Sequence, residues 1–374
     1  MSGLYIHIPF CACRCRYCAF YSTTRTEARD RYADAICAEM QMQAQSGTHS
    51  SPETIYIGGG TPSVLEAEQI LKIFHCIDST FGVGRSKETT IECNPDDIRQ
   101  PFLETLRATP VNRISMGIQS FDDRKLKLIG RRHTADDAKR AVRLCQDSGF
   151  DNISIDLIYG LPGQTVEEFV GDIHTAISLG VTHISAYCLS YEEGTPLTAM
   201  LKKGTITLVS DDDCALMYDA LCETMRSHGY THYEISNFAL PGYRSIHNSN
   251  YWNGTPYIGI GAAAHSFNGT ERKWNISDLD RYTNGILSGH PETGSEQLTP
   301  DDRYNEMIML ALRTSDGLDL RRLDTEFGAG TSAAFLSEAG VWIKKGDLIH
   351  IGGTVRFNES GLFRSDGITA SLFR

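Results

Sequence analysis

Four cysteines crowd into one short segment near the start of the chain, at positions 11, 13, 15 and 18, directly after the largely apolar run 4–10. Cys11, Cys15 and Cys18 stand at i, i+4 and i+7. This spacing lets three thiolates on one loop reach three corners of an iron-sulfur cubane, whereas a cluster that only carries electrons usually has four cysteine ligands. The spacing therefore predicts a [4Fe-4S] cluster with one iron open to a further ligand.

An open iron can be chelated by the amino and carboxylate groups of S-adenosylmethionine (SAM), and an electron passed into the sulfonium then makes a carbon radical. We therefore predict SAM as a second cofactor. The alternative is a structural zinc ion on all four sulfurs. Zinc ribbons usually divide their ligands between two distant pairs, which favours the iron-sulfur interpretation. Cys13 falls outside the spacing and is predicted to be a spectator.

Strand-like runs alternate with amphipathic helical stretches across the first two thirds of the chain. Such alternation is typical of βαβ crossovers and a parallel sheet. Polar and Gly-rich motifs follow the strand ends, which favours a barrel over an open sheet. We predict an α/β fold, a partial six-stranded parallel (β/α) barrel followed by a small C-terminal α+β domain. The predicted strands are 4–8, 54–57, 89–93, 113–118, 153–158 and 183–189.

The predicted domains are the barrel with its cysteine loop at 1–240, a chemically rich segment and linker at 241–295, and a small helical or winged domain at 296–374. The stretch from Asn268 to Thr299 is polar and weakly periodic, which suggests a linker. In the last part, the runs 348–351 and 354–357 predict a β-hairpin that turns at Gly352 and Gly353.

Composition limits the function. The formal net charge of −12 opposes general attraction to nucleic-acid phosphates, so we expect no nucleic-acid partner. No apolar run approaches the roughly 18 residues needed to cross a bilayer, and no signal peptide is recognisable. Eleven cysteines, an odd number, fit reduced thiols better than a paired secreted framework. These features predict a cytoplasmic protein.

Several motifs resemble those of radical SAM proteins of the oxygen-independent coproporphyrinogen III oxidase type, along nearly the whole chain. The motifs are Gly58-Gly-Gly-Thr61-Pro62, Glu92-Cys-Asn94-Pro95, Asn112-Arg-Ile-Ser-Met-Gly-Ile-Gln119-Ser120-Phe121, Gly130-Arg131-Arg-His133 and Asp156-Leu-Ile-Tyr-Gly160-Leu-Pro162-Gly163.

Within that group the sequence is most similar to the HemW heme chaperones. Three further segments carry this similarity: Tyr233-Glu-Ile-Ser-Asn237, His247-Asn-Ser-Asn-Tyr251-Trp252 and Gly259-Ile-Gly-Ala-Ala-Ala-His265-Ser266. Oxidases of the family have an N-terminal extension before the cluster and a further cysteine two residues after the last ligand. Here that position is Phe20, and both departures count against oxidase activity.

The resemblance implies a SAM site built from residues at or just past the strand ends. The Gly-rich turn would contact the amino acid end of SAM, Tyr17 the adenine, and the remaining polar side chains its ribose, amine and carboxylate. Each of them taken singly is more often a tight turn, a surface ion pair or a strand cap. The implied residues are Tyr5, Tyr17, Gly59, Gly60, Thr61, Glu92, Gln119, Arg131 and Asp156.

His247 precedes Tyr251 and Trp252 by four and five residues, and an imidazole beside flat aromatic surface suits heme. With the motif, His247 becomes the leading candidate for a heme ligand, and His232, His265 and the free cysteines are rivals. The resemblance implies a heme chaperone that passes heme to an unidentified acceptor protein; a membrane-associated acceptor and a homodimer are further options. The alternative is an oxygen-independent coproporphyrinogen III oxidase.

Overall fold

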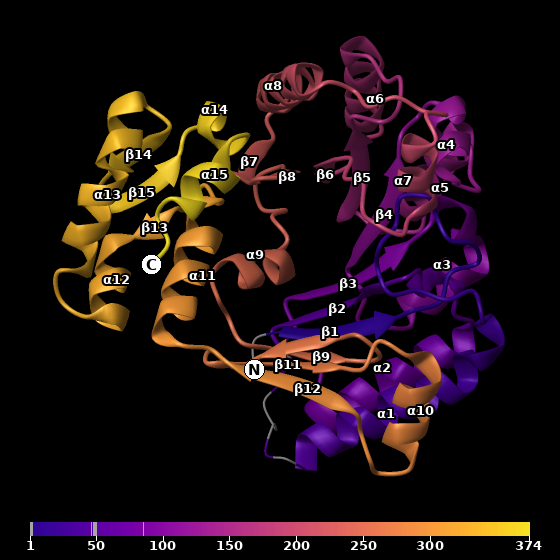
Figure 1. The fold of residues 1–374 in the computed structure, drawn as a ribbon. Helices are drawn as coiled ribbons and strands as arrows, with labels where there is room; N and C mark the ends of the chain where they lie inside the picture. The colour runs from indigo at the N-terminus through magenta and orange to yellow at the C-terminus, as the bar shows by residue number, and fades with distance from the viewer. Residues whose placement is uncertain (1–2, 46, 48–50, 85) are drawn as a thin grey trace.

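The computed structural model describes residues 3–45, 47, 51–84 and 86–374. Six parallel strands lie side by side in chain order and curve around a concave inner face (Figure 1). This arrangement confirms the predicted partial (β/α) barrel. The six strands are β1 Gly3–Ile8, β2 Thr54–Gly59, β3 Glu88–Cys93, β4 Arg113–Gln119, β5 Ile153–Tyr159 and β6 His183–Cys188.

Helices cover the convex face of the barrel, and their apolar sides pack on the strands. Several begin with a side-chain cap; for example, Thr134 and Thr165 each form a reciprocal capping box that satisfies the first free amides. The helices of this part are α1 Arg29–Gln45, α2 Ala67–Phe81, α3 Gln100–Arg107, α4 Asp123–Ile129, α5 Ala135–Asp147, α6 Val166–Ser178, α7 Pro196–Lys202 and α8 Asp211–Ser227.

The sheet extends beyond the six predicted strands at both edges. Next to β6 lie two antiparallel strands, β8 Asn237–Ala239 and β7 Thr231–Glu234. On the other side β9, Tyr257–Ile260, pairs parallel with β1, and β10 His265–Phe267, β11 Glu271–Asn275 and β12 Thr293–Gln297 follow as an antiparallel ribbon. The described sheet has 12 strands in total.

The predicted linker over 268–299 is therefore wrong. This segment holds β11, β12 and the helix α10, Leu279–Leu287, which packs on α1. A buried carboxylate holds them together: Glu39 of α1 accepts hydrogen bonds from Tyr282 Oη at 2.5 Å, Asn275 Nδ2 at 2.7 Å and Gly261 N at 2.8 Å. The sequence of this segment does not reveal these contacts, because Glu39 is far from its hydrogen-bond partners in the chain.

A second hydrophobic core forms the small C-terminal domain, which lies to one side of the barrel (Figure 1). Its hairpin turns at Gly352 and Gly353, with φ angles of 62° and 85°, as predicted. The elements are α11 Pro300–Leu312, β13 Leu318–Asp319, α12 Leu320–Phe327, α13 Thr331–Lys345, β14 Leu348–Ile351, β15 Thr354–Phe357, α14 Glu359–Leu362 and α15 Ser365–Ala370. No helix among the described residues is long and apolar enough to cross a membrane.

Candidate cofactor site

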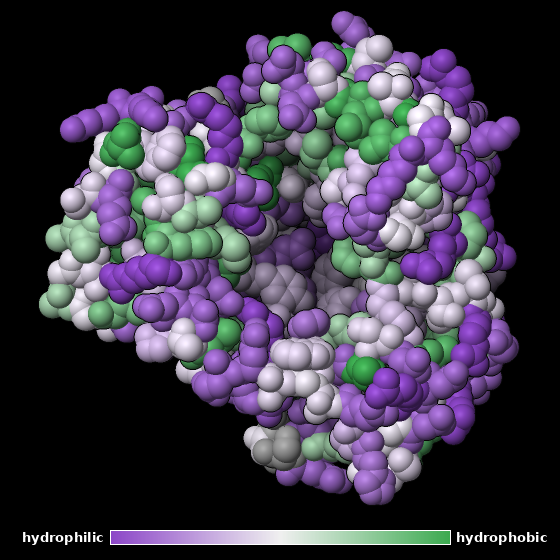
Figure 2. Space-filling model, in the orientation of Figure 1, coloured by the Kyte–Doolittle hydropathy of each residue, from purple (hydrophilic) through white to green (hydrophobic). Residues whose placement is uncertain are grey.

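A cavity of about 720 Å³ opens at the carboxyl ends of the parallel strands, and the molecule is visibly hollowed over the concave side of the sheet (Figure 2). Its volume lies in the range of roughly 300–1,000 Å³ that is usual for ligand sites. Most of the predicted site residues line it. These are Cys11, Cys15, Cys18, Tyr17, Gly59, Gly60, Thr61, Glu92, Gln119, Arg131 and Asp156.

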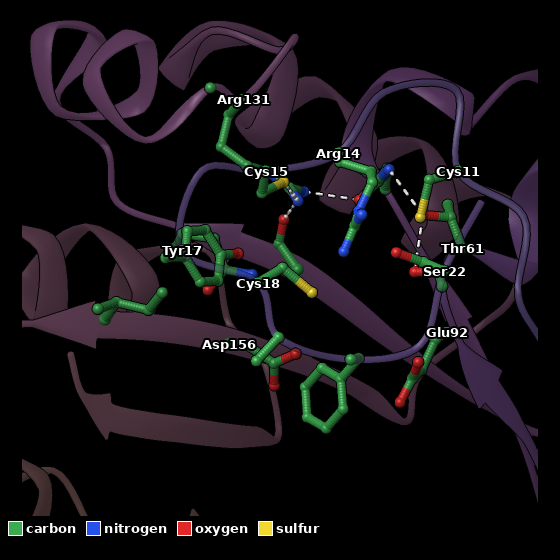
Figure 3. A pocket seen from close by; sticks show the side chains of 18 of the residues that line it. Cys11, Arg14, Cys15, Tyr17, Cys18, Ser22, Thr61, Glu92, Arg131 and Asp156 are labelled. Atoms are coloured by element: carbon green, nitrogen blue, oxygen red, sulfur yellow. Dashed lines mark hydrogen bonds between the residues drawn. The ribbon is translucent and has the colours of Figure 1, made fainter. Parts of the chain in front are cut away.

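The cysteine loop leaves β1 and is fastened at several points by its backbone. Near its start Cys11 N donates to Thr23 O at 2.8 Å. In its middle Arg16 N donates to Ile129 O at the end of α4, and Arg16 O accepts from Leu197 N at the start of α7, both at 2.9 Å. The loop is thus fastened to both α4 and α7, and Cys11, Cys15 and Cys18 line the cavity (Figure 3).

Two of the three predicted cluster thiols receive hydrogen bonds from neighbouring loops. Thr61 Oγ1 lies 3.4 Å from Cys11 Sγ and donates to it, and Arg131 Nη1 donates to Cys15 Sγ at 3.3 Å (Figure 3). Burial raises the pKa of Cys11 and Cys18, which disfavours thiolates in the absence of a cation. A thiolate bound to iron would be stabilised by these same donors.

The Cys13 sulfur lies 3.9 Å from Gly130 O, to which it donates a weak hydrogen bond. Cys13 lines the same cavity as the other three, and its role as a spectator stays a prediction. Among the described residues, no three His, Cys, Asp or Glu side chains gather closely enough to hold a single metal ion.

The Gly-rich turn after β2 is required by close packing against the cysteine loop. Gly59 has a φ of 116°, and a Cβ added to it would lie 2.6 Å from the ring of His7. A Cβ at Gly60 would lie 2.7 Å from the Pro9 carbonyl. The two glycines therefore allow β2 to approach the segment that leads to Cys11, and they leave their backbone exposed to the cavity.

Glu92 and Asp156 place two carboxylates on the inner wall. Glu92 accepts hydrogen bonds from Tyr56 Oη at 2.7 Å and Gly59 N at 2.9 Å. Burial raises the pKa of Glu92 to about 7 and that of Asp156 to about 6. The two groups are therefore poised to titrate near neutrality, and both are suited to accept hydrogen bonds from a ligand once ionised.

Gln119 and Arg131 show the local irregularity that often accompanies a binding site. Gln119 has a φ of 74°, unusual for a residue other than glycine, and the β4–β5 register shifts between Gly117 and Gln119. The bulge exposes Gly117 O, which accepts from Arg131 Nη2, and the same nitrogen donates to Asn94 Oδ1 at 2.7 Å. Arg131 Nε is buried without a partner among the described residues, so this side chain can still donate to a ligand.

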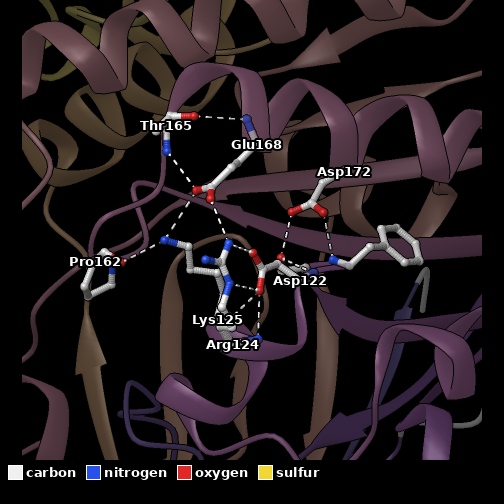
Figure 4. Close-up of polar contacts among 9 residues, drawn as sticks. Asp122, Arg124, Lys125, Pro162, Thr165, Glu168 and Asp172 are labelled. Carbon is white, nitrogen blue, oxygen red and sulfur yellow. Dashed lines mark hydrogen bonds and ion pairs between the residues drawn. The ribbon is translucent and has the colours of Figure 1, made fainter.

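A polar network behind the site fixes α4, whose last carbonyls hold the cysteine loop (Figure 4). Lys125 Nζ donates to Pro162 O at 3.1 Å and lies 3.4 Å from Glu168 of α6. Asp172, also on α6, accepts from Ser120 Oγ at 2.7 Å and Phe121 N at 2.8 Å. The loops after β4 and β5 are thereby tied to one helix, and they position the back of the cavity.

The donor set fits the two implied cofactors. Three thiols on one fastened loop match three irons of a cubane. The unpartnered Arg131 Nε and the two carboxylates suit the polar ends of SAM, and the cavity places all of them around one space. Cys11, Cys15 and Cys18 would hold the cluster, which when bound supplies the electron for cleavage of SAM.

Two predicted site residues lie outside this cavity. Tyr5 lies inside the barrel, and its hydroxyl bonds His7 Nδ1 at 2.9 Å. His247 is only 1% exposed; its Nδ1 is 2.9 Å from Thr54 Oγ1, its Nε2 is 3.0 Å from Tyr251 Oη, and its ring stacks on Tyr56. Because both ring nitrogens of His247 are engaged, this arrangement speaks against His247 as a heme ligand. Tyr5 as a SAM contact stays a prediction.

Other residues that line the cavity were not predicted. Asn94 accepts a hydrogen bond from Arg131 and so orients it. Tyr187 and Cys188 end β6 on the cavity wall. A signal for them exists in the sequence, because they lie at the carboxyl end of the sixth strand as Glu92 lies near the carboxyl end of the third.

Comparisons with known proteins agree with the fold. The model of the radical SAM superfamily matches residues 5–176, and that of the HemN C-terminal domain matches residues 298–364. The solved structure of coproporphyrinogen III oxidase (HemN) from Escherichia coli superposes with a TM-score of 0.86 over 100% of this chain and 90% of that chain, at 23% identity. Fold, cysteine loop and cavity together define a protein of the radical SAM class.

Relatives at higher identity narrow this class. The heme chaperone HemW of Bacillus subtilis is 36% identical over 353 residues, which are 94% of this chain and 93% of the relative. HemW of Lactococcus lactis is 36% identical over 87% of this chain and 85% of the relative, and HemW of Escherichia coli is 36% identical over 70% and 69%. The chain belongs to the HemW family.

Proposed function

We propose that this protein is a heme chaperone: it binds heme and transfers it to an acceptor protein, and it carries a SAM-ligated [4Fe-4S] cluster. The observation that carries the proposal is the similarity to HemW heme chaperones over nearly the full length of both chains. The acceptor, its association with a membrane, and a homodimer stay predictions.

The proposed cluster ligands are Cys11, Cys15 and Cys18. Their thiols share one cavity, and two of them already receive hydrogen bonds. The proposed SAM site comprises Tyr17, Gly59, Gly60, Thr61, Glu92, Gln119, Arg131 and Asp156, all on the wall of the same cavity. Glu92, Asp156 and Arg131 would orient the ligand by hydrogen bonds, and Tyr17 would shield it from water.

Oxidase activity is the second candidate, because the fold matches a coproporphyrinogen III oxidase. Phe20 argues against it. This side chain is 72% exposed and lines the cavity at the position where the oxidases have a further cysteine. An apolar ring there cannot ligate a metal or donate a proton.

One pair of measurements separates the two candidates. Ferric heme is titrated into anaerobic, cluster-loaded protein, and transfer is followed to an apo-hemoprotein; we expect stoichiometric binding and transfer. The same preparation with SAM and a reductant is given coproporphyrinogen III, and we expect no oxidative decarboxylation. Rapid formation of protoporphyrinogen IX, with no heme binding, would overturn the chaperone proposal.

A further inference from the structure

Two neighbouring helices on the convex face carry a pair of thiols away from the cavity. Cys37 lies on α1 and Cys76 on α2, and the two helices pack side by side (Figure 1). Cys76 Sγ lies 3.6 Å from Cys37 O, and Cys37 Sγ lies 4.0 Å from the carbonyl oxygen of Lys72, one turn before Cys76. Each sulfur therefore reaches the backbone of the opposite helix.

The two thiols contact each other through a hydrogen bond, and both are reduced in this structure. A disulfide needs two backbones that approach closely, with side chains that point toward each other. The reciprocal contacts of the two sulfurs meet this requirement. A salt bridge between Lys72 and Asp34, which stand one turn before Cys76 and Cys37, holds the helices in this arrangement. The pair is therefore placed to form a disulfide.

The pair also has the reactivity that oxidation requires. Cys37 is partly exposed, and Cys76 beside it is 6% exposed. The hydrogen bond from Cys37, followed by the Thr80 hydroxyl and the Lys72 ammonium, lowers the pKa of Cys76 to about 7. A substantial fraction of Cys76 is therefore the nucleophilic thiolate near neutral pH. The same hydrogen bond raises the pKa of Cys37, which keeps the second proton.

We propose that Cys37 and Cys76 form a dithiol site that reacts with hydroperoxides, with Cys76 as the attacking sulfur and Cys37 as the resolving sulfur. An accessible thiolate beside a second thiol is the usual arrangement at reversible redox sites. The product is an intramolecular disulfide that joins α1 to α2, two residues before Glu39, the carboxylate that holds the segment 261–282. Neither cysteine lines the cavity, so the inference goes beyond the proposed function and does not depend on it.

The reaction balances in two steps. The Cys76 thiolate attacks one oxygen of the hydroperoxide, so that an S–O bond forms and the O–O bond breaks; the leaving oxygen takes a proton and departs as an alcohol, or as water from hydrogen peroxide. Cys37 then attacks the sulfenic sulfur. The S–S bond forms, the S–O bond breaks, and the hydroxide takes the Cys37 proton and leaves as water. The two thiols lose two electrons, which the peroxide gains.

The test treats full-length, cluster-loaded protein with a small molar excess of hydrogen peroxide, with a chelator present to bind any iron that is released. Free thiols are then alkylated in denaturant, and tryptic peptides are analysed by mass spectrometry. Trypsin separates the two residues cleanly, because 32–72 contains Cys37 as its single cysteine and 73–85 contains Cys76 as its single cysteine. We expect these two peptides to be crosslinked after treatment and separate again after reduction with dithiothreitol.

Variants identify the attacking sulfur. Cys37→Ser keeps a hydroxyl donor beside Cys76, so we expect no crosslink but a sulfenic acid at Cys76 that a cyclic 1,3-dione traps. In Cys76→Ser we expect labelling of Cys37 to be at least about fivefold weaker. Cys222→Ser is the matched control: Cys222 is also a helical cysteine that is 6% exposed, but burial raises its pKa to about 12. This variant should form the crosslink as the wild type does.

Two results would overturn the proposal. If Cys37 and Cys76 of the wild type stay open to alkylation while other cysteines are oxidised, the pair is not a dithiol site. If the dione labels Cys37 in Cys76→Ser more strongly than Cys76 in Cys37→Ser, the assignment of the attacking sulfur is wrong. The wild-type measurement needs no substitution, so it decides the first question even where a variant folds poorly.

Discussion

The cysteine loop and the surroundings of His247, called here its pocket and formed by Thr54, Tyr56 and Tyr251, both carry distinctive sequence motifs. The two regions differ in how completely their polar groups are hydrogen-bonded. The loop directs its thiols to a cavity that also holds an unpartnered guanidinium nitrogen and two carboxylates with raised pKa values. In the pocket, both imidazole nitrogens are bonded and the ring is covered. Unused hydrogen-bonding capacity beside a cavity indicates a ligand site, whereas complete satisfaction indicates a structural role.

The pocket of His247 joins three distant parts of the chain. Glu88 at the start of β3 accepts hydrogen bonds from Ser245 Oγ, Ile246 N and His247 N, and so caps the helix α9, Ile246–Trp252. The imidazole then connects α9 to Thr54 at the start of β2. This helix closes the amino-terminal end of the barrel, opposite the cavity (Figure 1).

The largest effect is expected from the cluster thiols. Cys15→Ser should abolish assembly of the [4Fe-4S] cluster, because a serine oxygen is a poor ligand for iron in a cubane and only two of the three proposed ligand thiols remain. Iron and sulfide analysis with EPR of the reduced, reconstituted protein measures this. Cys13→Ser is the control and should keep the wild-type iron content. A fully loaded cubane in Cys15→Ser would contradict the assignment of the site.

The second-largest effect concerns the free energy of unfolding, which we expect to depend strongly on His247. His247→Ala should lower the free energy of unfolding by about 2–4 kcal/mol, because it opens a buried cavity and removes a hydrogen-bond partner from Tyr251 and from Thr54. Denaturant unfolding measures the change. His290→Ala, at an exposed histidine, should change it by less than about 0.5 kcal/mol.

Heme titration of the folded His247→Ala protein completes that comparison. We expect affinity within about twofold of the wild type, which is under 0.5 kcal/mol. If the folded His247→Ala protein no longer binds heme, His247 is a heme ligand and its surroundings are part of the heme site.

The sequence predicted the six parallel strands, and most of the predicted site residues line one cavity, because the information for both is local. Hydrophobic runs of fixed length define β1 to β6, and the functional side chains follow the ends of those strands. The sequence did not predict features whose interacting residues are far apart in the chain. The ribbon β10–β12 depends on Glu39, more than 200 residues earlier in the chain, and the burial of His247 depends on Thr54 and Glu88. No periodicity reports such contacts.

A smaller effect concerns the carboxylates of the cavity. Burial raises the pKa of Glu92 to about 7, so this group is largely protonated at pH 6 and ionised at pH 8. Because the carboxylate accepts hydrogen bonds best when ionised, affinity for SAM should rise over this interval. Glu92→Gln should bind about tenfold more weakly at pH 8 and nearly as well as wild type at pH 6.

Anaerobic calorimetry with cluster-loaded protein measures these affinities. Glu234→Gln is the matched control: burial raises the pKa of Glu234 to about 7 as well, but this residue lies on β7 and does not line the cavity. We expect its pH profile for SAM to follow the wild type. Parallel profiles for all three proteins would remove Glu92 from the SAM site.

The smallest effect should come from the hydrogen bond of Thr61 to Cys11 Sγ. A donor to a cluster thiolate stabilises the reduced cluster, which carries one more negative charge, more than the oxidised cluster. Thr61→Val should therefore lower the midpoint potential by an amount on the order of tens of millivolts with the iron content unchanged. Redox titration monitored by EPR measures the shift. Thr80→Val is the control: the Thr80 hydroxyl lies 3.8 Å from the sulfur of Cys76, which does not line the cavity, so the potential should stay unchanged. An unchanged potential in Thr61→Val would show that this contact positions the loop and does not tune the cluster. Of the two donors to the cluster thiols described above, the hydrogen bond from Arg131 to Cys15 would then remain as the one that could tune the potential.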